Sequence, residues 1–165
     1  MDGIVERLIR GFGNAPTSDF MISSGWAWPI AESFHFVGMC LLVGIVGLFD
    51  LRLLGMARSV SPAALHRLIP WGVAGFLINV ASGSMFLSGT PGQYIGGNQA
   101  FTFKMAFMAT AGLNVAVFYS TTFRKIRALG PGDDAPLAAK IIAGISLTLW
   151  IAIMTCGRLI TFYRP

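Results

Sequence analysis

The chain has 165 residues, of which 55% are hydrophobic and only 12% are charged, and its formal net charge is +5. A soluble domain carries about twice that charged fraction, so the composition excludes an ordinary soluble protein and leaves room for one membrane domain. The basic residues are scattered over the ends of apolar segments and form no run. They fit the positive-inside rule and give no indication of nucleic-acid binding.

Residues 1–25 predict a short amphipathic helix followed by a linker. Apolar residues from Ile4 to Phe12 recur at helical spacing, with Glu6, Arg7 and Arg10 outside that stripe. Such a helix either lies on the membrane surface or packs onto the rest of the protein. Residues 14–19, which contain a proline and small polar side chains, predict the linker.

Residues 26–165 predict an all-α integral membrane domain, a four-helix up-and-down bundle that follows the amphipathic N-terminal helix. Asn79 and Asn114 fall near the middle of the second and third helices, where we expect a structural hydrogen bond between their side chains. The four helices are expected at about 26–54, 68–87, 101–123 and 137–160.

The charges of the connecting segments predict how the bundle is oriented. The 88–100 loop carries no charge, whereas the other two connections carry Arg58, Arg67, Arg124, Lys125, Arg127 and Lys140. Basic loops stay in the cytoplasm. We therefore expect a multi-pass protein of the bacterial inner membrane with both termini in the periplasm.

Ionisable residues at matching depths predict a clamp between the first and fourth helices. Glu32 and Asp50 lie about five turns apart at one angle of the first helix, and Lys140 and Arg158 have the same spacing on the fourth. We expect the ion pairs Glu32–Arg158 near the outer surface and Asp50–Lys140 near the inner one, because paired charges are tolerated in a membrane.

The outer half holds more polar residues than this clamp needs. His35 follows Glu32 by one turn on the same face, and the Glu32 carboxylate is expected to fix the imidazole tautomer. Lys104 and Arg158 reach the same depth from other helices. An imidazole with thioether neighbours is a soft ligand set, which suits Cu(I) or the axial position of a haem. Alternatively, the methionines fill the core and His35 only bonds Glu32. The methionines of this half are Met39, Met85, Met105, Met108 and Met154.

The other histidine, His66, is expected in a solvated position at the cytoplasmic start of the second helix, about 30 Å of bilayer away from His35. The two cannot ligate one haem within a protomer. Ligation by two histidines would then need His35 from two protomers, or Met85 or Met108 would supply the second axial bond. The two cysteines, Cys40 and Cys156, lie in apolar segments and are interpreted as small buried hydrophobic residues.

Three stretches, WAWPIAESFHFVG, NQAFTFKMAFM and LWIAIMTCGRLITFY, resemble a family of uncharacterised bacterial four-helix inner-membrane proteins, a domain of unknown function. That family is distantly similar to the copper resistance D proteins and to four-helix membrane b-type cytochromes. The resemblance implies the fold and, as cofactors, copper or haem b, but no established activity. Its marks are an E-x-x-H, an F-x-x-K and a G-R motif, at Glu32, His35, Phe101, Lys104, Gly157 and Arg158.

These observations favour two functions. The first is a binding or redox module whose outer-leaflet polar site holds copper or haem and passes electrons, protons or metal to a periplasmic partner. The second is a structural membrane subunit whose charges only clamp the helices. We expect no enzyme acting alone, since no nucleophile–base pair or phosphate-binding loop is present. The expected partners are the lipid bilayer, a periplasmic protein and a second copy of the chain.

Overall fold

A computed structural model describes residues 2–163, and every regular element within them is helical. Four stretches are long and apolar enough to cross a membrane, as the sequence predicts. The predicted ends of the first, second and fourth lie within about two residues of the observed ones, the usual uncertainty of helix ends. The long helices are α3 (Ala27–Leu54), α5 (Ile69–Gly89), α7 (Gln99–Val117) and α9 (Leu137–Leu159).

The third stretch extends beyond its predicted end. A π-helical segment, η1 (Phe118–Thr122), and a short helix, α8 (Phe123–Arg127), follow α7 without a break. A π turn changes the angle at which the following side chains leave the helix. Here Tyr119 and Phe123 both contact the ring of His66 on α4 (Pro62–His66).

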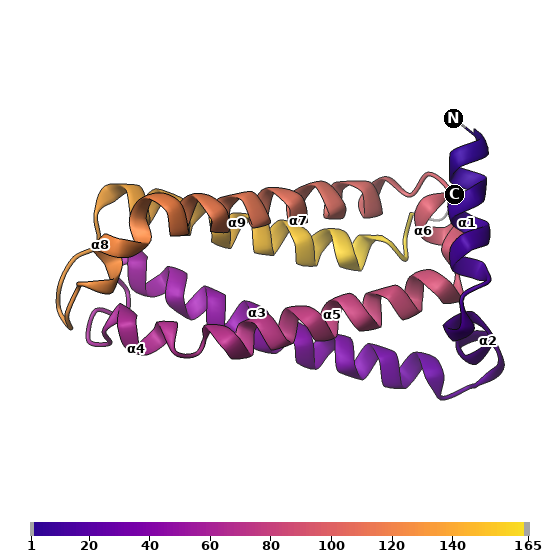
Figure 1. Ribbon diagram of the computed structural model, residues 1–165, viewed down its shortest axis with the longest axis horizontal. Helices are drawn as coiled ribbons and strands as arrows, with labels where there is room; N and C mark the ends of the chain where they lie inside the picture. Colours follow the sequence, from indigo (N-terminus) through magenta and orange to yellow (C-terminus); the bar gives the residue numbers. More distant parts are fainter. Residues whose placement is uncertain (1, 164–165) are drawn as a thin grey trace.

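Figure 1 shows the long helices as two pairs, α3 beside α5 and α7 beside α9. Glycines allow the first pair to come very close. A Cβ added at Gly38 would lie 2.8 Å from the Gly75 carbonyl oxygen, and one at Gly75 would lie 2.7 Å from the Gly38 carbonyl oxygen. The two backbones therefore touch, an arrangement typical of membrane helices, whose association depends on close packing.

The two pairs meet through α3 and α9. Their contact lies at the end of the molecule that holds α4 and α8, hereafter the α4/α8 end. Ala139 and Ala143 of α9 are fully buried there against Phe49 and Leu53 of α3. Toward the other end α3 diverges from α9, as Figure 1 shows. The outward faces of all these helices are large and apolar, as expected of a surface in contact with lipid: Phe34, Leu77, Leu113 and Ile151 are about three-fifths exposed.

The opposite end, hereafter the terminal end, holds α1 (Asp2–Gly13), α2 (Pro16–Ser23), α6 (Pro91–Ile95) and both chain termini (Figure 1). The prediction of a linker at residues 14–19 is wrong, because α2 is a packed helix. Met21 is 1% exposed and lies against Ala27 and Ala31, and the Thr17 hydroxyl donates to Ser88 Oγ at 2.9 Å. Tertiary contacts override the weak helix preference of this segment.

The predicted amphipathic N-terminal segment is helical and lies across the terminal end, against α5 and α6. Val5, Ile9 and Phe12 are partly buried, whereas Ile4 and Leu8 are 68% and 46% exposed. The helix therefore packs on the bundle through one apolar edge and leaves a second apolar edge open.

Candidate functional site

The candidate site of the terminal half is built around His35, on the face of α3 that packs against α5. Its Nδ1 lies 2.8 Å from the Ser82 hydroxyl, and that hydroxyl donates its single proton to the Ile78 carbonyl at 2.7 Å. With the Ser82 proton assigned to the Ile78 carbonyl, the imidazole donates from Nδ1, and Nε2 keeps a lone pair. A neutral histidine held in this way has the tautomer that binds metals through Nε2.

This contact corrects the expected role of Glu32. The carboxylate does not fix the imidazole, because the partner of Nδ1 is Ser82, a residue that the sequence analysis missed. Ala31 and His35 lie one turn apart and share the packed face of α3, whereas Glu32, 100° further round, is exposed. A serine in an apolar helix is a weak signal by itself, since its hydroxyl often bonds only its own helix.

The surroundings of His35 are partly apolar. The Phe86 ring stands edge-on to the imidazole at a centroid distance of 5.5 Å, and Gly83 leaves space beside Cε1. Met39 follows His35 by one turn and is partly buried. An imidazole nitrogen and a thioether thus leave the same helix four residues apart, a spacing that places both on one face.

Lys104 approaches this site from α7. A Cβ added at Gly157 would lie 3.4 Å from Lys104 Nζ, so the absence of a side chain at Gly157 leaves room for the ammonium against α9. Lys104 is within electrostatic range of both His35 and Cys156. Each long helix therefore contributes one side chain to this group, hereafter the His35 group: His35, Ser82, Lys104 and Cys156.

The structure does not gather the methionines around His35. Met85 packs against the cluster that contains Met21 of α2, and Met108 packs between α7 and α9. Met105 and Met154 are each 37% exposed. Met39 is the thioether that shares a helix face with His35. Within residues 2–163, no group of three or more His, Cys, Asp or Glu side chains is placed to hold a metal. Cys40 is exposed on α3, so its interpretation as a buried residue is wrong.

The predicted clamp between α3 and α9 is wrong at its outer level. Glu32 and Arg158 are both exposed, no ion pair joins them in the described part of the chain, and the Arg158 guanidinium lies 5.7 Å from the centre of the Phe162 ring. The prediction assumed parallel axes. Packed helices cross at an angle, and α3 and α9 diverge toward the terminal end (Figure 1).

The clamp is wrong at its inner level too. Lys140 Nζ pairs with Asp134 at 2.7 Å, and Asp134 also pairs with Arg58 at 3.1 Å. The hydrogen bond from Lys140 and the charge of Arg58 lower the pKa of the Asp134 carboxyl. Asp50 is buried beside Ser146 of α9, and its Oδ2 has no partner among the described residues. Lys140 prefers an acid at the membrane edge, where its ammonium keeps contact with water.

The asparagines do not bond each other. Asn79 donates to the Gly75 carbonyl of its own helix at 2.9 Å, and Asn114 donates to the Ile142 carbonyl of α9 at 3.1 Å. The hydrogen bond of Asn114 therefore joins α7 to α9 and not, as predicted, α7 to α5. Backbone carbonyls are available along every helix, so a sequence does not reveal which one an amide will reach.

Arg52 is the largest polar group that the sequence analysis missed. It is 0% exposed, and it donates to the carbonyls of Val60, Gly130 and Asp133, the last two at 3.2 and 3.1 Å. One guanidinium therefore ties the connection after α3 to the connection before α9. Its role depends on where two loops fold, which the position of Arg52 near a helix end does not indicate.

His66 is partly exposed, and its ring also has aromatic partners that the sequence analysis did not identify. Its Nε2 lies 3.1 Å from the Tyr119 hydroxyl, and its ring lies 4.7 Å from that of Phe123. It remains at the α4/α8 end, far along the bundle from the His35 group, as expected.

No family model matches this chain, and neither a curated protein nor a solved structure matches it. The function is therefore inferred from the geometry of the side chains.

Proposed function

We propose that this chain is a multi-pass protein of the bacterial inner membrane that binds Cu(I) at His35, within an up-and-down bundle of four membrane-spanning helices. The single observation that carries the proposal is the bond between His35 Nδ1 and Ser82 Oγ, because it leaves Nε2 with a free lone pair. Cu(I) favours imidazole and thioether ligands, and Met39 supplies a thioether on the same face of α3.

Lys104 gives this site a further property. An ammonium within electrostatic range of the imidazole opposes the binding of a cation, so the site holds copper less tightly than its ligands alone would. A moderate affinity suits a protein that passes the ion to a periplasmic partner.

The decisive experiment measures copper bound to the protein purified in detergent under reducing conditions. We expect about one copper per chain by metal analysis and competition with a chromogenic Cu(I) chelator. His35→Ala should abolish binding, Met39→Leu should weaken it about tenfold, and the matched control His66→Ala should bind like the wild type. Retention of copper by His35→Ala would refute the site. A Soret band that disappears in His35→Ala would assign haem in place of copper.

A structural membrane subunit without a ligand is the second candidate. The observation that favours it is Arg52, a buried charge that donates through Nε and Nη2 to backbone carbonyls of two connections and so holds the fold together. A protein that binds neither copper nor haem, and whose His35→Ala variant assembles normally, would establish this role.

We further propose that both termini, α1 and α6 lie on the periplasmic side. The α4/α8 end carries the basic connections, and both termini lie at the opposite end of the molecule (Figure 1). The positive-inside rule then places the α4/α8 end in the cytoplasm. The open edge of α1, Ile4 and Leu8, would rest on the outer leaflet.

Reporter fusions test this topology. Alkaline phosphatase joined to the C-terminus should be active in cells, because the enzyme folds only in the oxidising periplasm, and green fluorescent protein at the same point should stay dark. Fusions within the 128–136 connection should give the opposite result. An active phosphatase in that connection would invert every depth assigned above.

A further inference from the structure

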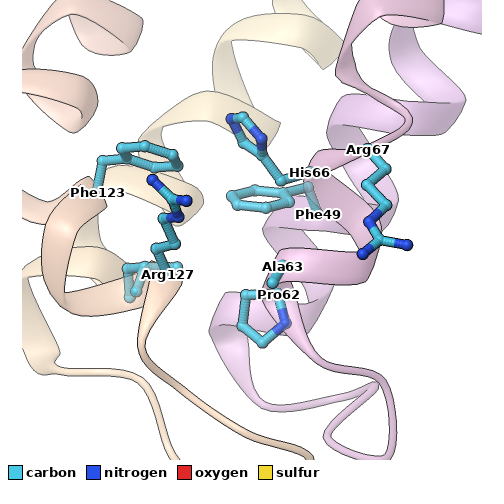
Figure 2. A pocket seen from close by; sticks show the side chains of 8 residues that line it. Phe49, Pro62, Ala63, His66, Arg67, Phe123 and Arg127 are labelled. Atoms are coloured by element: carbon cyan, nitrogen blue, oxygen red, sulfur yellow. The ribbon is translucent and has the colours of Figure 1, made fainter.

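A cavity of about 460 Å³ opens at the α4/α8 end, between α4 and α8. Phe49, Phe123 and Ile126 form its apolar part, and His66, Arg67 and Arg127 add polar groups. Figure 2 shows the Arg127 side chain in the space between the two helices, near the Phe123 ring, and Arg67 on the other side of α4. The cavity thus has an aromatic wall, with Arg127 beside that wall and Arg67 on the far side of α4.

The two arginines are not neutralised by the protein. Neither Arg67 nor Arg127 makes an ion pair or a side-chain hydrogen bond with residues 2–163. Of the two acids in the connection after α8, Asp134 pairs with Arg58 and Lys140, and Asp133 accepts a hydrogen bond from the Gly130 backbone N–H. The cavity therefore carries positive charge that an external anion can balance.

The aromatic wall is fixed in place. The His66 ring is held by the Tyr119 hydroxyl and lies between the rings of Phe49 and Phe123, at centroid distances of 6.4 and 4.7 Å. The π turn in the third stretch presents Tyr119 and Phe123 to α4. A wall built from three separate segments keeps its shape without a ligand, which lowers the cost of binding one.

We propose that this cavity binds an anionic phospholipid, with the phosphate at Arg127 and the upper part of an acyl chain along Phe49 and Phe123. The occupant must be both anionic and apolar, since an arginine and aromatic rings line the same space. It must also reach the ends of membrane-spanning helices, where lipid headgroups lie. Arginine binds phosphate through paired hydrogen bonds, and Arg67 strengthens the local positive potential. This inference does not depend on the His35 site.

Thermal unfolding of the full chain in a neutral detergent tests the proposal, with three probes titrated separately: phosphatidylglycerol, phosphatidylcholine with the same chains, and inorganic phosphate. A ligand that binds only the folded state raises the unfolding temperature, and the shift grows with the logarithm of the free ligand concentration divided by its Kd. We expect phosphatidylglycerol to stabilise the wild type and phosphatidylcholine and inorganic phosphate to have little effect. Native mass spectrometry should detect the retained lipid.

Variants localise the effect. Arg127→Gln should need about tenfold more phosphatidylglycerol for the same shift. Arg124→Gln is the matched control, because it removes one exposed arginine from the same helix outside the cavity. Ala63→Trp, which fills the cavity without changing its charge, should also prevent lipid retention.

Three results would overturn the proposal. Equal stabilisation by phosphatidylcholine would show that the headgroup charge is irrelevant. Equal losses in Arg124→Gln and Arg127→Gln would show diffuse attraction to a basic surface. A shift with inorganic phosphate alone that depends on Arg127 would assign the cavity to a soluble phosphate compound instead of a lipid.

Discussion

The two ends of the bundle treat their buried polar groups differently. At the α4/α8 end, Arg52 donates to three backbone carbonyls, and Asp134 pairs with Arg58 and Lys140. In the terminal half, His35 makes one hydrogen bond and keeps a free Nε2, and Lys104 has no hydrogen bond or ion pair within residues 2–163. The contrast is not one of complete satisfaction, because Arg52 Nη1 and Asp50 Oδ2 are also buried without a partner among the described residues. It lies in what the charges do: at the α4/α8 end they tie connections and helix ends together, whereas in the terminal half the Lys104 ammonium has no protein partner within residues 2–163.

The largest test of this comparison is Arg52→Met, which keeps much of the side-chain volume and removes every donor. We expect a loss of about 3 kcal/mol in the free energy of unfolding, because buried carbonyls lose a charged partner. Arg58→Met is the control. Its ion pair is half-exposed, so its loss should stay below about 1 kcal/mol in the same unfolding assay. Equal effects would mean that Arg52 is not the residue that ties the connections together.

A smaller effect is expected from Ser82→Ala. Without its hydroxyl, the imidazole loses the partner that fixes its tautomer, and affinity for Cu(I) should fall about 10-fold to 100-fold. Ser84→Ala is the matched control on the same helix, because the Ser84 hydroxyl bonds only the Val80 carbonyl and is exposed. Competition with a Cu(I) chelator measures both variants. If Ser82→Ala bound copper as well as the wild type, Ser82 would be irrelevant to the site.

The smallest effect concerns Glu32 and Arg158, which the sequence places in one ion pair and the structure does not. In a double-mutant cycle with Glu32→Ala and Arg158→Ala, the losses of stability should be additive within about 0.5 kcal/mol, as for residues that do not touch. Arg158→Ala alone should cost about 0.5–1 kcal/mol, the value of an exposed contact between a cation and an aromatic ring. A larger coupling energy would restore the predicted clamp.

The sequence by itself determined the class of protein and its spans. Apolar runs of about 20 residues specify membrane helices independently of any partner, since each helix satisfies its own backbone hydrogen bonds. The ends of α3 and α9 were therefore predictable from local composition alone. Helix α2 was not, because contacts with other helices stabilise it, among them the burial of Met21 against Ala27 and Ala31 and the bond from Thr17 to Ser88.

The tertiary structure decided which groups the polar side chains contact. The sequence placed Glu32, His35 and Asp50 on one stripe of α3, but it assigned all three the wrong partners. The stripe shows in which direction a side chain leaves its own helix. The residue that this side chain contacts depends on how the neighbouring helices cross. Gly38 and Gly75 draw α3 onto α5, which brings Ser82 to His35, while the divergence of α3 from α9 leaves Glu32 and Arg158 apart. Arg52 finds its carbonyls only when two loops fold over it, so packing, rather than periodicity, separates the structural charges from the candidate site.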